Sequence, residues 1–355
     1  MLTILLTLGC SEPAQPPQVK PAVVAPAPAP APAPVTVDPT RLGVFAPLPA
    51  AMTGDGKPAA PALVDLGRTL YYDTRFSKNQ DVSCNSCHLL DSYGVDGMPT
   101  STGHKGQKGG RNAPTSYNAA GHLAQFWDGR AADVEAQAKG PVLNPIEMAM
   151  PNEKAVVGVL TSIPGYKTLF EAAFPGDKAP ITYDHMAQAI GAFERGLTTP
   201  GPFDRFLAGD ASALTDAQKA GLNTFLDTGC VACHTGTYVG GSMYQKVGLV
   251  QPWPNQADPG RVKVTNNEAD TMFFKVPSLR NIEKTGPYFH DGSVADLDTA
   301  VTMMGRHQLG KELTAEQVKS IRSFLGALTG TPDAAYIAKP TLPESGPKTP
   351  KPDPT

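Results

Sequence analysis

Cys84-Asn-Ser-Cys87-His88 and Cys230-Val-Ala-Cys233-His234 are two copies of the pattern C-x-x-C-H, and they decide the fold of this 355-residue chain. They use four of its five cysteines, and Cys10 is the fifth. The spacing suits covalent attachment of a c-type haem, because two thiols can bond to the two vinyl groups of one porphyrin. The adjacent histidine then reaches the iron.

Disulfides and a zinc site are the alternatives for these cysteines. A disulfide does not require the trailing histidine, and four cysteines with two histidines exceed the four ligands of a structural zinc. The pattern leaves the sixth position of each iron open. By itself it therefore does not separate an electron carrier from an enzyme.

The rest of the chain has helical periodicity and lacks convincing period-2 strands. Apolar residues recur at helical spacing in four stretches: residues 63–70, 186–197, 215–226 and 314–328. Thr215 with Gln218 and Thr314 with Gln317 form capping-box patterns at the start of the last two. Gly67 weakens the helix expected in the first stretch.

The motifs start at positions 84 and 230, which are 146 residues apart, a domain length. We therefore predict a mostly α-helical protein with two cytochrome c-like domains, residues 41–200 and residues 201–338. Each domain would carry one covalently attached haem c. The break at Thr198-Thr-Pro-Gly-Pro202 favours this boundary.

Both ends of the chain differ from this central part. Residues 1–10 are apolar and end in Gly9-Cys10, which resembles a bacterial lipoprotein signal with Cys10 as the lipidated residue; an unremarkable apolar terminus is the alternative. Residues 11–40 contain ten prolines and predict an extended tether. Residues 339–355 are again rich in proline, and we expect a disordered tail.

Composition excludes two further classes of protein. With 30 Lys+Arg against 33 Asp+Glu, the net charge of −3 gives no reason to expect a nucleic-acid partner. No apolar run approaches the ~20 residues of a spanning helix, so a membrane would be reached only through a lipid anchor. Attachment of haem c implies export, which places the protein in the periplasm.

Other residues could occupy the open iron positions. Five histidines lie outside the motifs: His104, His122, His185, His290 and His307. His104 stands out because residues 94–110 form a loop with six glycines, which can approach a haem closely and can also move. Met303 and Met304 are candidate ligands in the second half, where methionine would raise the haem potential.

The order of these motifs resembles the bacterial dihaem cytochrome c peroxidase family. In the first half the resemblance rests on S-C-N-S-C-H, G-V-D-G-M-P-T-S-T-G-H, R-N-A-P-T, A-Q-F-W-D-G-R, A-K-G-P-V and I-E-M, between residues 81 and 148. In the second half it rests on residues 230–234, 276–281 and 284–292. It covers roughly residues 60 to 330.

The resemblance implies ligands for two haem c irons. His88 would be the proximal ligand of a first, peroxidatic haem, with His104 as its displaceable distal ligand. His234 and Met304 would hold a second, electron-transferring haem. Met304 fits the pattern because it directly precedes Gly305, and Met303 is the alternative.

It also implies catalytic and calcium-binding residues. Glu147 would transfer protons during cleavage of hydrogen peroxide, with Gln137 beside it, and Trp127 would lie between the haems. Asn112, Thr285 and Pro287 would bind Ca²⁺, the first through its side-chain oxygen and the others through carbonyl oxygens.

The function implied is reduction of H₂O₂ to water, with electrons from a small cytochrome c or a cupredoxin. A homodimer is also compatible with the family. The rivals are a relative that oxidises a partner protein, a plain dihaem electron carrier and a haem-based redox sensor. Met303 and Met304 argue against the relative that oxidises a partner protein. Glu147 and the glycine-rich loop argue against the plain electron carrier. A sensor would need an output module, and none is visible in the sequence.

Overall fold

The computed structural model describes residues 2–6, 9–11, 14–15 and 34–355. The chain divides into two units, residues 1–34 and residues 35–355, and the second holds the helices and strands given below. Much of the expected tether, and part of the expected signal, lies outside the described residues. Among the described residues, no helix is long and apolar enough to cross a membrane.

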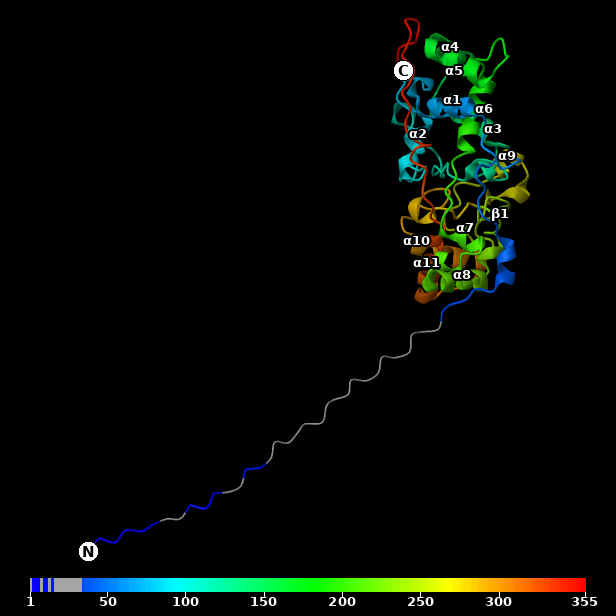
Figure 1. Cartoon of the computed structure of the whole chain (residues 1–355). Coiled ribbons are helices and arrows are strands. Elements are labelled where there is room, and N and C mark those ends of the chain that lie inside the picture. Colours follow the sequence, from blue (N-terminus) through cyan, green and yellow to red (C-terminus); the bar gives the residue numbers. More distant parts are fainter. Residues whose placement is uncertain (1, 7–8, 12–13, 16–33) are drawn as a thin grey trace. The chain divides into compact units, whose positions relative to one another are not determined.

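The first group of helices lies between residues 61 and 194. Its members are α1 (Pro61–Tyr72), α2 (Cys84–Cys87), α3 (Val134–Leu143), α4 (Glu153–Ser162), α5 (Pro164–Ala173) and α6 (Tyr183–Glu194). Figure 1 shows α1 and α3–α6 gathered at one end of the second unit.

The second group follows the proline-containing break at residues 198–202. Its helices are α7 (Pro202–Leu207), α8 (Asp216–Thr228), α9 (Val262–Thr265), α10 (Leu297–Met303) and α11 (Ala315–Ala327). Two short antiparallel strands, β1 (Tyr244–Lys246) and β2 (Phe273–Lys275), pair with Gln245 opposite Phe274. The prediction of a mostly helical protein is confirmed.

The capping residues read from the sequence begin their helices as predicted. The Thr215 hydroxyl accepts from the Gln218 backbone N–H, and Gln218 Oε1 accepts from the Thr215 N–H in return. The same pair of bonds joins Thr314 and Gln317. Each box satisfies two donors that a helix start otherwise leaves free, so α8 and α11 begin at fixed positions.

Gly67 has a packing role that the sequence did not reveal. It lies inside α1, where a Cβ atom would come within 1.8 Å of the Ala189 carbonyl oxygen in α6. Only glycine allows this close approach of α1 and α6.

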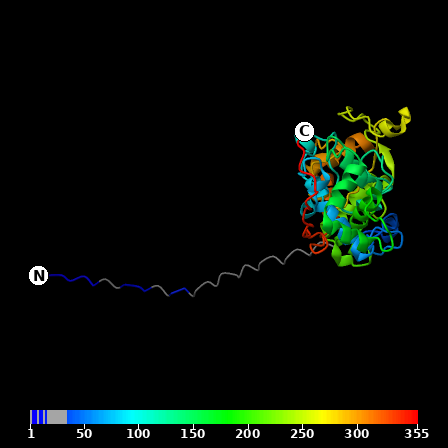
Figure 2. The same ribbon diagram turned by 90° about the horizontal axis from the view of Figure 1, so that it is seen from above.

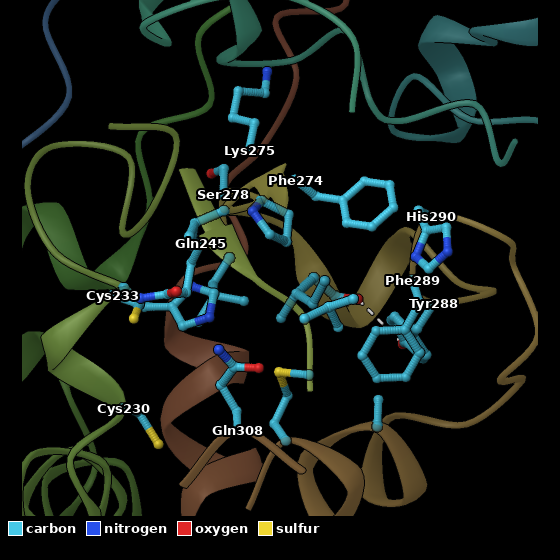
Figure 3. Close-up of a pocket in the computed structure, with 18 of the residues that line it drawn as sticks. Cys230, Cys233, Gln245, Phe274, Lys275, Ser278, Tyr288, Phe289, His290 and Gln308 are labelled. Carbon is cyan, nitrogen blue, oxygen red and sulfur yellow. Dashed lines mark hydrogen bonds between the residues drawn. The ribbon is translucent and has the colours of Figure 1, made fainter. Parts of the chain in front are cut away.

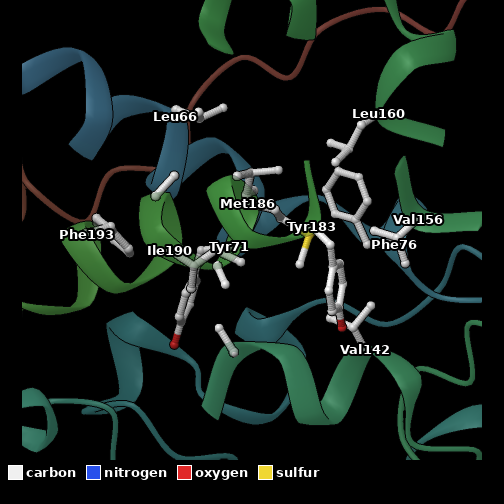
Figure 4. Close-up of a cluster of buried hydrophobic side chains, with 14 of the residues drawn as sticks. Leu66, Tyr71, Phe76, Val142, Val156, Leu160, Tyr183, Met186, Ile190 and Phe193 are labelled. Carbon is white, nitrogen blue, oxygen red and sulfur yellow. The ribbon is translucent and has the colours of Figure 1, made fainter. Parts of the chain in front are cut away.

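The apolar side chains form two large clusters on either side of the break. The first, shown in Figure 4, includes Leu66, Tyr71 and Phe193 and ends with Leu197. The second includes Phe203 of α7 and is dominated by α8 and α11, where Phe225 packs against Phe324. Each C-x-x-C-H motif contributes its first cysteine to the edge of one cluster.

The first residues of the second unit pack on the second cluster, and its last residues pack on the first cluster. Val37 and Phe45 are buried in the second cluster, and the Asn223 side chain donates to the Thr36 carbonyl at 2.9 Å. Residues 36 and 37, which the sequence assigned to the tether, are therefore packed against the second cluster, because Val37 is apolar. At the other end, Tyr336 stacks on Phe193 with ring centroids 5.2 Å apart.

The expectation of a disordered tail at residues 339–355 also differs from the structure. This segment follows the first group of helices and is tied to it by hydrogen bonds, including Arg75 Nη1 to Ser345 Oγ at 3.0 Å. Proline lacks an N–H and favours extended backbone, but it does not prevent the other residues from bonding to a neighbouring surface.

Candidate functional site

The first C-x-x-C-H motif forms a single helical turn. Ser83 caps α2 in a reciprocal arrangement with Ser86, and the His88 N–H closes the turn onto the Cys84 carbonyl at 3.0 Å. Tyr71 of α1 donates its hydroxyl to the His88 carbonyl at 3.0 Å, which fixes the motif to the first cluster. Burial lowers the pKa of His88, so its imidazole is neutral at pH 7 and able to bind a metal.

The glycine-rich loop places His104 against the segment that carries Glu147. The His104 N–H donates to the Glu147 carbonyl at 2.8 Å. A Cβ on the preceding residue, Gly103, would lie 2.2 Å from the Ile146 carbonyl oxygen, so this approach requires glycine. The His104 side chain is buried, and its Nδ1 has no hydrogen-bond partner among the described residues.

Glu147 is held by one hydrogen bond and has a shifted pKa. Its carboxylate accepts from Asn144 Nδ2 at 2.7 Å, which fixes the side chain. Burial raises the pKa of Glu147, and the charge of Arg130 and the bond from Asn144 act in the opposite direction. A carboxyl group with a raised pKa keeps its proton to a higher pH than a free carboxyl group does.

Gln137 lies on α3 and is half-buried, and Glu147 lies in the segment between α3 and α4. The α3 helix and this segment are joined through the backbone, where the Met148 N–H donates to the Pro141 carbonyl at 3.2 Å. The Gln137 side chain makes no hydrogen bond to Glu147.

The second motif follows the end of α8. Gly229 ends that helix with a φ of 97°, which glycine adopts without strain, and turns the chain into Cys230. Cys230, Cys233, His234 and Met304 all line one cavity of about 260 Å³. Figure 3 shows the two cysteines on one side of this cavity and Phe274, Phe289 and His290 on the other.

The two methionines differ in their position relative to the cavity. Met304 lines it and begins a π-helical turn, Met304–Gln308, that follows α10. Such turns are rare and often occur at functional sites. Met303 is not among the lining residues and packs against the hydrophobic clusters.

The residues of both motifs fit haem c. The second cavity has a mostly apolar lining, two thiols, a neutral imidazole and a thioether, which are the groups that bind a porphyrin and its iron. Burial lowers the pKa of His234 to about 4, so this ring is also neutral. At the first motif, His88 Nδ1 and His104 Nδ1 are buried without partners among the described residues.

The three residues expected to bind calcium all line the same cavity. Asn112 donates its side-chain amide to the Met98 carbonyl at 3.0 Å, which leaves its side-chain oxygen free. Thr285 and Pro287 offer carbonyl oxygens, so the set consists of hard oxygen donors. The described residues contain no group of three or more His, Cys, Asp or Glu suited to a metal ion.

Trp127 lies beside these residues. Its Nε1 donates to the Asn112 carbonyl at 2.9 Å, and its ring meets that of His290 edge-on at 6.4 Å. His290 in turn stacks on Phe274 at 4.2 Å, and all three rings line the cavity.

The sequence did not single out several residues that shape the site. Asn144, Phe274 and His290 are among them; Asn144 precedes Glu147 by three residues, a spacing that allows a side-chain contact within one turn. His290 stood in the quoted motif at residues 284–292 without an assigned role. A buried Lys275 also bonds to the Ala124 carbonyl at 2.8 Å.

Known proteins resemble the chain over most of its length. The family described as di-haem cytochrome c peroxidase matches residues 61–212. Cytochrome c551 peroxidase of Nitrosomonas europaea is 48% identical, over 82% of this chain and 86% of that protein. The protein of the same name from Pseudomonas aeruginosa is 44% identical, over 87% and 90%.

One solved structure shares the fold with 29% sequence identity. It is a MauG-like protein associated with microbial copper homeostasis, with a TM-score of 0.71. The match covers 86% of this chain and 97% of that one.

Proposed function

Because this chain belongs to the di-haem cytochrome c peroxidase family, as its motifs indicated, we propose that it reduces hydrogen peroxide to water. The chain is an enzyme of that family and carries two haem c groups. The reaction takes two electrons and two protons for each H₂O₂ and yields two molecules of water. A small cytochrome c or a cupredoxin would supply the electrons.

One observation carries this proposal: the backbone bond that fixes His104 to Glu147. It joins the backbone of the expected displaceable ligand to the backbone of a residue whose carboxyl pKa is raised. A plain electron carrier needs neither a mobile ligand nor an acid/base group. Cleavage of peroxide requires an acid/base group, and a six-coordinate iron must lose one ligand before peroxide can bind.

Separate residues would hold the two haem groups. His88 and His104 are the proposed ligands of the first iron, and His234 and Met304 those of the second. The haem groups supply storage and transfer of electrons, from the second to the first. Met304 is preferred to Met303 because it shares a cavity with His234.

The chain's own residues would handle the protons. Glu147, fixed by Asn144, takes a proton from the near oxygen of H₂O₂ and returns it to the departing oxygen, which leaves as water. Gln137 on α3 would orient the peroxide from the same side. Trp127 would lie between the two haem sites, supported by its contact with His290.

The remaining proposals concern calcium, location and assembly. Asn112, Thr285 and Pro287 would bind Ca²⁺ at the cavity edge. The protein would work in the periplasm, anchored to a membrane through a lipid on Cys10. A homodimer is compatible with the family relationship.

The decisive experiment is turnover of H₂O₂ by the purified dihaem protein, fully oxidised or half-reduced, with a one-electron donor. Fast turnover only after half-reduction is the expected result. His104→Gly should make the oxidised protein active, because the displaceable ligand is gone. If neither form of the wild type turns over peroxide, the protein is an electron carrier or an oxidant of a partner protein.

A further inference from the structure

Residues 340–355, which we call the strap, follow the first group of helices. Thr349 accepts from Ser162 Oγ at 3.2 Å at the end of α4, and the Pro350 carbonyl accepts from Gln80 Nε2 at 2.8 Å. Figures 1 and 2 both show this segment, in red, lying along one side of the first group. The strap thus begins just after Tyr336 and Ile337, which pack on the first cluster, and reaches the loop before the first haem motif.

The last residues of the strap lie at the site itself. Lys78 Nζ donates to the Thr355 main-chain oxygen at 2.8 Å and lies 3.5 Å from Asp353 Oδ2, and the Asp353 N–H donates to the Lys78 carbonyl at 2.9 Å. His104 Nε2 is 3.4 Å from the same Thr355 oxygen. The strap therefore offers a hydrogen-bond acceptor to the imidazole that is proposed to leave the first iron.

Lys78 connects this contact to the acid/base segment as well. Its backbone N–H donates to the Met148 carbonyl at 2.8 Å, next to Glu147. One lysine thus links the strap, through its side chain, with the segment of Glu147, through its backbone. Loss of the strap would act on His104 directly and leave the Glu147 carboxylate and its bond from Asn144 in place.

The chemistry of imidazole makes this contact exclusive. A ring nitrogen that carries a proton and donates it to a carbonyl has no free electron pair for a metal. Nε2 can therefore bond to Thr355 or to iron, but not to both, and a His104 held by the strap could reach iron only through Nδ1.

We propose that the strap, through its contact with Nε2, competes with the first iron for His104 and so favours the form that is open to peroxide. This inference rests on the proposed role of His104 as a displaceable ligand. One hydrogen bond changes an equilibrium constant by between about twofold and tenfold. The strap would therefore shift the equilibrium between iron-bound and released His104, but other contacts would contribute to it as well.

Two variants and a control test the proposal. Truncation after Thr349 removes the acceptor, and Lys78→Met removes the bond that holds it in place. Ser345→Ala is the control, since it breaks only the bond to Arg75 at the far end of the strap. The readouts are the high-spin fraction of the first haem in the half-reduced protein, by absorption and EPR, and the rate of cyanide binding.

We expect both quantities to fall, by about three- to tenfold for the truncation and by a smaller factor for Lys78→Met, with no change for Ser345→Ala. If the truncated protein fails to fold, as judged by circular dichroism, Lys78→Met decides alone. An unchanged or increased high-spin fraction in a folded variant would overturn the proposal.

These readouts do not depend on peroxidase activity. If the wild type fails to reduce peroxide but the variants still lose the high-spin form, the proposed function fails and the role of the strap stands. If the wild type reduces peroxide and the variants bind cyanide as it does, the strap is only a structural element.

Discussion

Arg280 and Asp204 form a buried ion pair, with Nη1 and Oδ2 2.7 Å apart. The remaining groups of both side chains are also satisfied. Asp204 accepts from the backbone N–H groups of Leu48 and Gly201, and Arg280 donates to the Thr237 carbonyl. The pair therefore joins the segment that follows the tether to α7 and to the loop after β2.

Asp204→Asn should destabilise the protein by about 3–5 kcal/mol, because it leaves the Arg280 charge buried without a partner. Urea unfolding followed by circular dichroism would measure the change. Glu312→Gln, which breaks the exposed pair between Glu312 and Arg306, is the control and should leave the unfolding midpoint unchanged. Equal midpoints for Asp204→Asn and wild type would show that the buried pair contributes nothing.

Glu194 predicts a dependence of stability on pH. Burial raises its pKa to about 8, and the neighbouring Glu135 adds to the shift while Arg195 opposes it. Because the pKa in the folded state is above the unfolded value of about 4.5, folding favours the protonated form. The stability that this preference supplies is complete below pH 4.5 and is lost as the pH rises through 8.

Glu194→Gln should remove that pH dependence. Above pH 8 the variant should be more stable than the wild type, by at most about 5 kcal/mol at 1.36 kcal/mol per pKa unit. Denaturant titrations at several pH values between 5 and 9 would test this. Glu171→Gln, at an exposed position, is the control, and a wild-type curve as flat as that of Glu194→Gln would contradict the prediction.

Local sequence patterns predicted the helices well, because capping boxes and apolar spacing act within one element. Thr215 and Thr314 begin α8 and α11 as their patterns indicated. Contacts between distant segments were not predictable in this way. Gly67 seemed to weaken α1 until the close approach of Ala189 was known, and the prolines of residues 339–355 gave no sign of their bonds to the first group of helices.

At the site, too, features formed by neighbouring residues in the sequence were predictable, and contacts between distant residues were not. The C-x-x-C-H spacing predicts attachment of haem without any knowledge of the fold, since thiols and imidazole are adjacent in the chain. The bond from His104 to Glu147 joins loops 43 residues apart (positions 104 and 147), and the stack of His290 on Phe274 depends on β2. Such pairs follow only from the tertiary structure.

Met304 and Met303 allow a direct test of the second iron ligand. Met304→Ala should lower the reduction potential of the second haem by on the order of 100 mV or more, because a thioether ligand favours the reduced iron. Met303→Ala is the matched control, since Met303 lies outside the cavity lining, and it should cost stability through lost packing. Spectroelectrochemical titration measures the potential, and a large fall with Met303→Ala instead would exchange the roles of the two residues.

Glu147→Gln should reduce the rate of peroxide turnover by about 10²- to 10⁴-fold, because the amide keeps the size of the side chain but cannot exchange a proton. The haem spectra and the potential of the second haem should remain as in the wild type. Glu153→Gln, six residues away at the start of α4 and exposed, is the control and should be fully active.

Asn144→Ala should have a smaller effect than Glu147→Gln, because Asn144 only fixes the carboxylate. Since the bond from Asn144 lowers the pKa of Glu147, its loss should raise that pKa further. Because Glu147 must be ionised to take the first proton, the acid limb of the pH–rate profile should move to higher pH. Steady-state rates between pH 5 and 9 would measure both quantities. If Asn144→Ala does not shift the pH–rate profile, another group carries out the proton transfer. Normal turnover by Glu147→Gln would lead to the same conclusion.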